Sequence, residues 1–163
     1  MQNEQLPQNM LNEYDRDPGR WRPLMYPVFI DVPIIEGNIG RGAITINAQP
    51  FVLIRLTHTI VGATADPEAS GLYNDGQYTI GFQDEISNYQ KQPVMAETAF
   101  GSVRSGFFAN LAIPIPFAGN RTINFEVANQ VQRVLTPESD YFRVSITMIG
   151  LADLGELKAP GRR

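Results

Sequence analysis

Residues 141–150 read YFRVSITMIG, and the strict alternation of apolar and polar side chains in this stretch decides the fold class. One face of the extended chain would carry the apolar side chains Phe142, Val144, Ile146 and Met148. The opposite face would carry Arg143, Ser145 and Thr147. A repeat of two residues is typical of a strand in a sheet with one buried face and one solvated face.

The alternation recurs in the segments that precede this strand. Residues 122–127 predict a strand with Ile123, Phe125 and Val127 on one face. Residues 77–82 predict another, with Tyr78, Ile80 and Phe82 together. In the run 51–61 the spacing puts Val52, Ile54, Leu56 and Ile60 on one face. Shorter strands are predicted at 28–32, 43–47, 107–113 and near 97–100, with a turn at Gly37, Gly40 and Gly42.

Loops rich in Gly and Pro separate these strands, and no window has a convincing helical stripe of apolar residues. Short strands at this spacing predict an all-β fold, an antiparallel β-sandwich. The connections at 62–76 and 84–106 are too long for simple hairpins, so they favour strands that cross between sheets in a jelly-roll-like topology. Pro114 and Pro116 indicate an edge position or a bend after residue 113.

Residues 1–27 differ in composition from the rest of the chain, with four prolines among Asn, Gln, Arg and Asp residues. Because each proline favours extended backbone, this segment predicts an extended N-terminal arm. A sandwich domain would follow at 28–155, and a short tail at 156–163. Large side chains in the arm would anchor it on a neighbouring protein, and the candidates are Tyr14, Trp21, Leu24 and Met25. A flap of the arm over its own domain and a disordered arm are the alternatives.

Composition limits the possible partners. The chain has 163 residues, no cysteine and 43% apolar residues, which fits one globular domain without disulfides or thiolate metal sites. Thirteen basic and seventeen acidic residues give a net charge of −4 without a basic stripe, so no nucleic-acid partner is expected. No apolar run approaches the roughly 20 residues of a membrane span, and residues 1–10 lack the apolar stretch of a secretory signal. No membrane partner is expected either.

No group of residues predicts catalysis, so we expect a protein that is not an enzyme and that needs no cofactor or metal. His58 is the only histidine, and its position beside apolar strand residues favours a structural role. Asp84 and Glu85 would point to opposite faces of an extended segment. The glycine-rich stretch 37–42 lacks the lysine and the following helix of a phosphate loop. Calcium binding by oxygen-rich loops and carbohydrate binding by aromatic residues are minor alternatives.

The sequence resembles the jelly-roll cement proteins, also called decoration proteins, of tailed bacteriophage capsids. The resemblance lies in the order of strands and turns rather than in one motif. Five segments carry it: PFVLIRLTHTIVG (50–62), GQYTIGFQDEISNY (76–89), FGSVRSGFFANLAIPIPF (100–117), NRTINFEVANQV (120–131) and YFRVSITMIGL (141–151). Together they cover most of the predicted domain.

This resemblance implies a viral structural protein, made in the host cytoplasm and located in the virion on the outer capsid surface. Such proteins clamp neighbouring capsomers, so the implied partners are the major capsid protein and copies of the chain itself, as a homotrimer. The arm at 1–27 would be the element that reaches across subunit boundaries. The alternatives are another virion component (neck, tail or spike), a small jelly-roll capsid subunit, or a carbohydrate-binding module.

Overall fold

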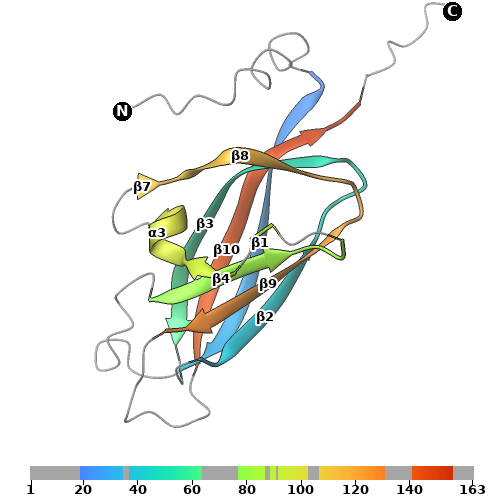
Figure 1. Ribbon diagram of the computed structural model, residues 1–163. Coiled ribbons are helices and arrows are strands. Elements are labelled where there is room, and N and C mark those ends of the chain that lie inside the picture. Colours follow the sequence, from blue (N-terminus) through green and yellow to red (C-terminus); the bar gives the residue numbers. More distant parts are fainter. Residues whose placement is uncertain are drawn as a thin grey trace, which may run out of the picture.

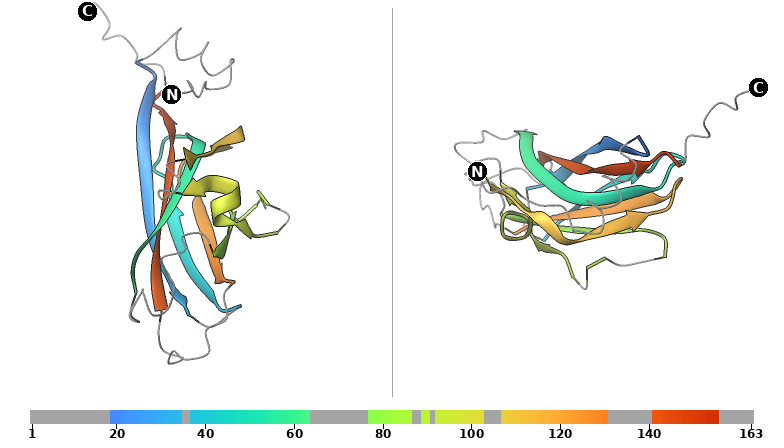
Figure 2. Two further views of the ribbon diagram at one scale, coloured as in Figure 1. Left: turned by 90° about the vertical axis from the view of Figure 1, so that its left-hand side faces the viewer. Right: turned by 90° about the horizontal axis from the view of Figure 1, so that it is seen from above.

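The computed structural model describes residues 19–34, 37–63, 77–86, 89–90, 92–102, 107–130 and 141–155. Two antiparallel four-stranded sheets lie one over the other (Figure 1, Figure 2), which confirms the predicted all-β sandwich. The first sheet has the order β1 (Trp21–Pro33), β10 (Tyr141–Asp153), β3 (Phe51–Ala63) and β8 (Asn110–Phe117). The second has the order β2 (Ile39–Thr45), β9 (Thr122–Asn129), β4 (Tyr78–Gln83) and β5 (Val94–Met95). A short helix, α3 (Ala96–Phe100), and two short strands, β6 (Gly101–Ser102) and β7 (Phe107–Phe108), connect β5 to β8.

The strands of the two sheets pair in a nested order along the chain. β1 pairs with β10, β2 with β9, β3 with β8, and β4 with β5, and each of these pairs is antiparallel. The pairings of β10 with β3 and of β9 with β4 then complete the two sheets. The chain therefore crosses repeatedly from one layer to the other, as the long connections in the sequence indicate.

The core lies between the two sheets and is filled by alternate residues of each strand. On β10 the predicted apolar face is buried, namely Phe142, Val144, Ile146 and Met148. On β9 and β4 the buried residues are also the predicted ones: Ile123, Phe125, Val127, Tyr78, Ile80 and Phe82. These three strands show that a repeat of two residues identified the core face wherever the strand is regular.

β1 corrects the predicted boundary between an arm at 1–27 and a domain at 28–155. Residues 21–27 are not part of an arm, because they pair with β10 from Trp21↔Asp153 to Pro27↔Thr147. Their prolines hid the strand in the sequence, since proline interrupts most ladders but is tolerated on an edge strand such as β1. Gly19 and Arg20 form a turn before β1, and residues 1–18 of the predicted arm and the tail at 156–163 lie outside the described residues.

β2 begins at Ile39, so Gly40 and Gly42 lie inside a strand and not in the predicted turn. Both glycines face β1. A Cβ on Gly40 would overlap the backbone oxygen of Asp31 and would lie 2.8 Å from Cγ2 of Ile30. The missing side chains thus allow β1 and β2 to approach closely, which closes the sandwich on this side.

β3 changes its buried face part of the way along its length. Phe51 and Leu53 are buried at its start, and Leu56 is buried further on. The register with β10 shifts between Leu53 and Arg55, as expected for a bulge that inserts one extra residue. The predicted shared face was therefore wrong for Val52 and Ile54, which are half-buried and stand outside the core cluster.

Two further segments differ from the expected strands. Residues 97–100 belong to the helix α3, which is too short to show a helical repeat in the sequence. β8 does not end at residue 113, because it continues through Pro114 and Pro116 to Phe117. It does lie at an edge of the first sheet, and this confirms the position that the two prolines predicted.

Candidate functional site

The outer face of the first sheet exposes two large apolar side chains on β1. Met25 is 66% exposed and Phe29 is 60% exposed. The register places Met25 beside Ile149 and Phe29 beside Ser145. We call this surface the Met25 face, and it comprises Met25, Pro27, Phe29, Thr57, Thr59, Ser145, Thr147 and Ile149. These eight side chains are apolar or carry a single hydroxyl, so a partner protein could cover them without burying a charge. Arg55 pairs with Ile149 at the border of this face, and its Nε donates to Asn110 Oδ1 at 2.8 Å.

The charges at one end of the Met25 face neutralise each other. Arg143 Nε donates to Asp31 Oδ1 at 2.6 Å, and Arg143 Nη2 donates to Asp31 Oδ2 at 2.9 Å. The hydrogen bond from Arg143 holds the pKa of Asp31 below its usual value. A bidentate pair of this kind has a fixed geometry, and it leaves this end of the face without net charge.

The free edge of β1 lacks hydrogen-bond donors at three positions. Arg20 O accepts a hydrogen bond from Leu154 N at 2.8 Å, so even-numbered residues of this strand direct their backbone groups toward β10. Odd-numbered residues direct theirs away from β10, and these include Pro23, Pro27 and Pro33. Because proline has no N–H, the row of donors along this edge is interrupted at these three positions, which weakens it as a template for another strand.

The opposite edge of the first sheet has the same feature. Since proline cannot donate, the hydrogen-bonded partners of β3 in this part of β8 are Ile115 and Phe117. Pro114 and Pro116 alternate with them, so their nitrogen atoms lie on the outer side. Prolines therefore interrupt the donors along both edges of the sheet that carries the Met25 face, which favours a partner that approaches the face itself.

The predicted anchors fall in different environments. Tyr14 lies outside the described residues. Trp21 is half-buried at the start of β1, with the Arg20 guanidinium carbon 5.3 Å from its ring centroid. Leu24 packs against the core of its own domain, whereas Met25 points outward. Of these four residues, Met25 has the side chain most available to a partner among those described, and the partner role of each stays a prediction.

An ion pair fixes the point at which the chain enters β1. Arg20 Nε donates to Asp153 Oδ1 at 2.7 Å, and Arg20 Nη2 donates to Asp153 Oδ2 at 2.5 Å. The hydrogen bond from Arg20 lowers the pKa of Asp153. The first residues of β1 are thus tied to the last residues of β10. This pair could not be predicted from the sequence, because 133 positions separate its members.

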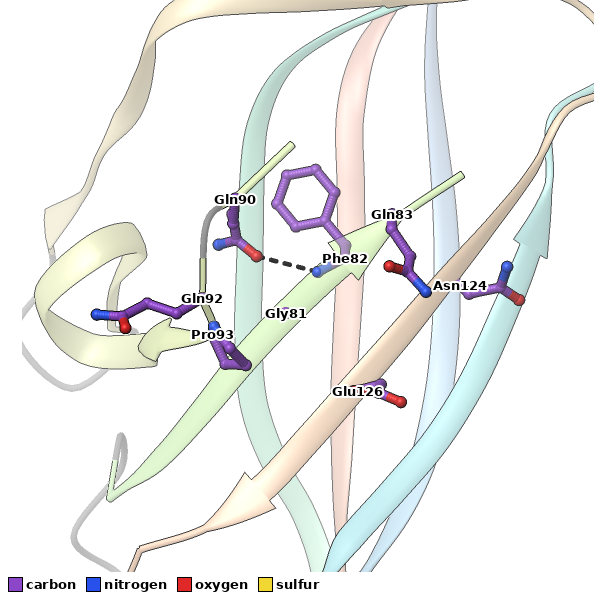
Figure 3. Close-up of a pocket in the computed structure, with 8 residues that line it drawn as sticks. All are labelled: Gly81, Phe82, Gln83, Gln90, Gln92, Pro93, Asn124 and Glu126. Atoms are coloured by element: carbon purple, nitrogen blue, oxygen red, sulfur yellow. Dashed lines mark hydrogen bonds between the residues drawn. The ribbon is translucent and has the colours of Figure 1, made fainter. Parts of the chain in front are cut away.

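A groove lined by amide side chains crosses the outer face of the second sheet (Figure 3). It consists of two adjoining hollows of about 150 and 450 Å³. Both hollows share the side chains of Gln83, Asn124 and Glu126. Register explains the arrangement, because Asn124 lies between Gln83 on β4 and Ala43 on β2, and Glu126 lies between Gly81 and Arg41. Small residues thus stand beside long polar ones.

The chain after β4 forms one wall of this groove. Phe82 N donates to Gln90 Oε1 at 3.0 Å, which caps the free edge of β4 next to the two-residue strand β5 (Figure 3). Pro93 lies over Gly81, where a Cβ would be 3.2 Å from the proline ring. Tyr89 stacks on Phe82 at 5.7 Å and donates a hydrogen bond to Asp84 Oδ2 at 2.6 Å. These contacts hold Gln90 and Pro93 in place, and no short motif in the sequence could have indicated them.

His58 and Asp84, two residues considered for catalysis, make contacts within the fold. His58 is buried, with its Nδ1 2.6 Å from the hydroxyl of Tyr78, in agreement with the structural role predicted for it. Asp84 organises its own loop by accepting hydrogen bonds from Ile86 N and Tyr89. Within the described parts of the chain, no three His, Cys, Asp or Glu side chains gather as they would around a metal ion. The same parts contain no helix with the length and hydrophobicity needed to cross a membrane.

Comparisons with protein families, with curated proteins and with solved structures gave no match for this chain.

Proposed function

We propose that the chain is a capsid cement protein, a virion structural protein that binds the outer surface of a viral shell through its Met25 face. The observation that carries this proposal is the exposure of Met25 and Phe29 on a sheet whose two edges are interrupted by prolines. Exposed apolar groups that lie together on one surface are typical of interaction sites. The major capsid protein would be the partner, and residues 1–18 would extend the contact to a neighbouring subunit.

The order of the strands supports a jelly-roll assignment, which is a common architecture of viral shell proteins. The first of the eight main strands pairs with the last, the second with the seventh, the third with the sixth, and the fourth with the fifth. A long hairpin rolled into two layers gives this nested order. The assignment agrees with the resemblance in strand order, although fold alone does not define function.

The Met25 face can supply a useful part of the binding free energy. Fully burying one large apolar side chain contributes roughly 1.5–3 kcal/mol. Met25 and Phe29 are each more than half exposed, so most of this contribution is still available to a partner. Many copies on one shell would add such contributions over the whole assembly.

The test measures the binding of purified variants to shells that lack the protein. Met25→Lys and Phe29→Lys should each weaken cosedimentation with shells by about tenfold or more, since each removes apolar contact and introduces a charge to be buried. Ile113→Lys is the matched control, because Ile113 is 79% exposed but lies on β8, away from the Met25 face. Equal affinities for the three variants and the unaltered protein would refute the role of this face, and no binding of the unaltered protein would refute the function.

Deletion of the first eighteen residues tests the arm. The cut must come before Arg20, because residues 21–27 belong to β1 and a longer deletion would remove part of the sheet. A folded protein with weaker shell binding is the expected result. Unchanged binding would refute a role of the N-terminal segment in shell binding.

A further inference from the structure

The groove on the second sheet is suited to a neutral and strongly hydrogen-bonding ligand. Its polar lining is mainly the amides of Gln83, Gln90, Gln92 and Asn124. The two charged residues, Arg41 and Glu126, form an ion pair at 2.9 Å and cancel each other. An amide carries both donors and acceptors, and although Gln90 Oε1 already accepts from Phe82 N, the other three amides offer both, so the matching ligand must present both kinds of group at short intervals.

A polypeptide matches this chemistry better than a sugar or a nucleic acid. Among the lining residues, the aromatic rings of Phe82 and Phe125 are only 5% and 1% exposed, so neither offers a surface on which a sugar ring could stack. A phosphate backbone would meet Glu126 without an unpaired cation to balance it. An extended peptide, in contrast, presents one donor and one acceptor for each residue other than proline.

The chain itself contains a segment of suitable composition. Residues 1–12 read MQNEQLPQNMLN, in which half of the side chains are amides: Gln2, Asn3, Gln5, Gln8, Asn9 and Asn12. Amide side chains can pair with the amides of the groove while the backbone fills the remaining donors and acceptors. Pro7 favours the extended conformation that such a groove requires.

The connection to β1 favours a groove in a second copy over the groove in the same copy. Arg20 is held by Asp153 in the first sheet, whereas the groove lies on the outer face of the second sheet, the opposite layer of the sandwich (Figure 2). In the same copy the segment would have to pass around the side of the sandwich. A segment of about 18 residues can span up to roughly 60 Å when extended, which is enough to reach an adjacent copy.

We propose that the groove formed by Gln83, Gln90, Gln92 and Asn124 binds the N-terminal segment of a second copy of this chain. The contact is heterologous, because a segment of one copy enters a groove of the next. Reciprocal exchange between two copies gives a closed dimer, and repeated exchange in one direction closes into a ring when the rotation between copies allows it, so the expected product is a closed oligomer. This inference deepens the proposed function by assigning the self-association surface, but it can be tested without any shell.

The test is light scattering with size-exclusion chromatography on the full chain over a range of concentrations. The unaltered protein should form the oligomer, and a Gln83→Ala, Asn124→Ala variant should be monomeric at the same concentrations. A Thr45→Ala, Thr122→Ala variant is the matched control, since these residues form a hydrogen-bonded pair at 3.3 Å on the same face but do not line the groove. A Gln5→Ala, Gln8→Ala variant removes the complementary amides from the segment and should also be monomeric.

A labelled synthetic peptide of residues 1–18 provides the second measurement. It should bind the unaltered protein and compete with oligomer formation, and it should bind the groove variant about five- to tenfold or more weakly. Monomeric behaviour of the unaltered protein at every concentration would overturn the inference, as would an oligomer that survives in the groove variant. Binding of a glycan to the groove without competition by the peptide would show that the ligand class is wrong. These results leave shell binding through the Met25 face untouched, so the two proposals can fail separately.

Discussion

Replacement of Gly150 by alanine should destabilise the fold, because β10 passes the start of β3 at this point without room for a side chain. A Cβ on Gly150 would overlap the backbone oxygen of Val52 and would lie 2.7 and 2.9 Å from Cζ and Cε2 of Phe51. Neither neighbour can move easily. Val52 contributes a backbone atom of a paired strand, and the ring of Phe51 is fully buried and packs edge-on against Tyr26 at 5.0 Å.

The size of the effect follows from this packing. Overpacking a well-filled core costs about 1–3 kcal/mol, and the upper part of that range applies because a backbone atom must shift. For a chain of 150–250 residues each kcal/mol lowers the melting temperature by about 2–4 °C, so a loss of about 3 kcal/mol corresponds to roughly 6–12 °C. Urea unfolding and thermal melting should both show this loss, with an unchanged urea m-value.

Gly62→Ala is the matched control for this experiment. Gly62 also lies in the first sheet beside a register shift, but a Cβ there would meet no atom within 4 Å. Its free energy of unfolding should change by less than about 1 kcal/mol, and it could rise because alanine restricts the unfolded chain. If Gly150→Ala were as stable as Gly62→Ala, the close approach of β10 to β3 would not be a real constraint and the reasoning would fail.

Two further predictions concern the ion pairs and the sheet edges. The pKa values of Asp31 and Asp153 are lowered in the folded protein. As the pH falls, the unfolded chain therefore binds protons before the folded protein does. The stability that these carboxylates provide above pH about 4 is lost as the pH falls below that value. Asp31→Asn with Asp153→Asn should therefore flatten the decline of the urea midpoint between pH 5 and pH 2 (about the range set by these groups), and a decline as steep as that of the unaltered protein would contradict this assignment. Pro27→Thr with Pro114→Thr restores two N–H groups on the free edges of the first sheet and should promote association through those edges, seen as increased light scattering in concentrated solution. Pro50→Thr is the control, because Pro50 lies outside the strands, and it should scatter no more light than the unaltered protein. If the double variant also scatters no more light than the unaltered protein, the prolines do not protect the edges.

The regular strands of this protein could be predicted from the sequence because burial alternates with the residue number. In β4, β9 and the part of β10 up to Met148, burial alternates without interruption, so the apolar residues read directly as the core face. The prediction failed where another physical factor dominates. In β1 the prolines occupy positions that need no donor, and in β3 the bulge at Ile54 reverses the face.

The candidate surfaces were harder to predict, since both depend on register between distant strands. Met25 could be named as an anchor because it is large and apolar, but its neighbour Leu24 looks the same in the sequence and packs inward. The groove was missed entirely. Its floor and walls come from β2, β4, β9 and the segment near Gln90, and only the pairings Arg41↔Glu126 and Gln83↔Asn124 bring those residues together.

The thirteen paired positions between β1 and β10 also determine how the molecule would respond to a mechanical load. β1 starts and β10 ends at the same end of the sheet. A force that separates the two termini would therefore break the residue pairs between these strands one after another, beginning with the Arg20–Asp153 ion pair. A force that pulls the N-terminal segment along the strand axis, while the sheet is held by its outer face, would instead act in shear on all the hydrogen bonds between β1 and β10 at once. A tether attached ahead of Arg20 is therefore strong in one direction of pull and weak in the other.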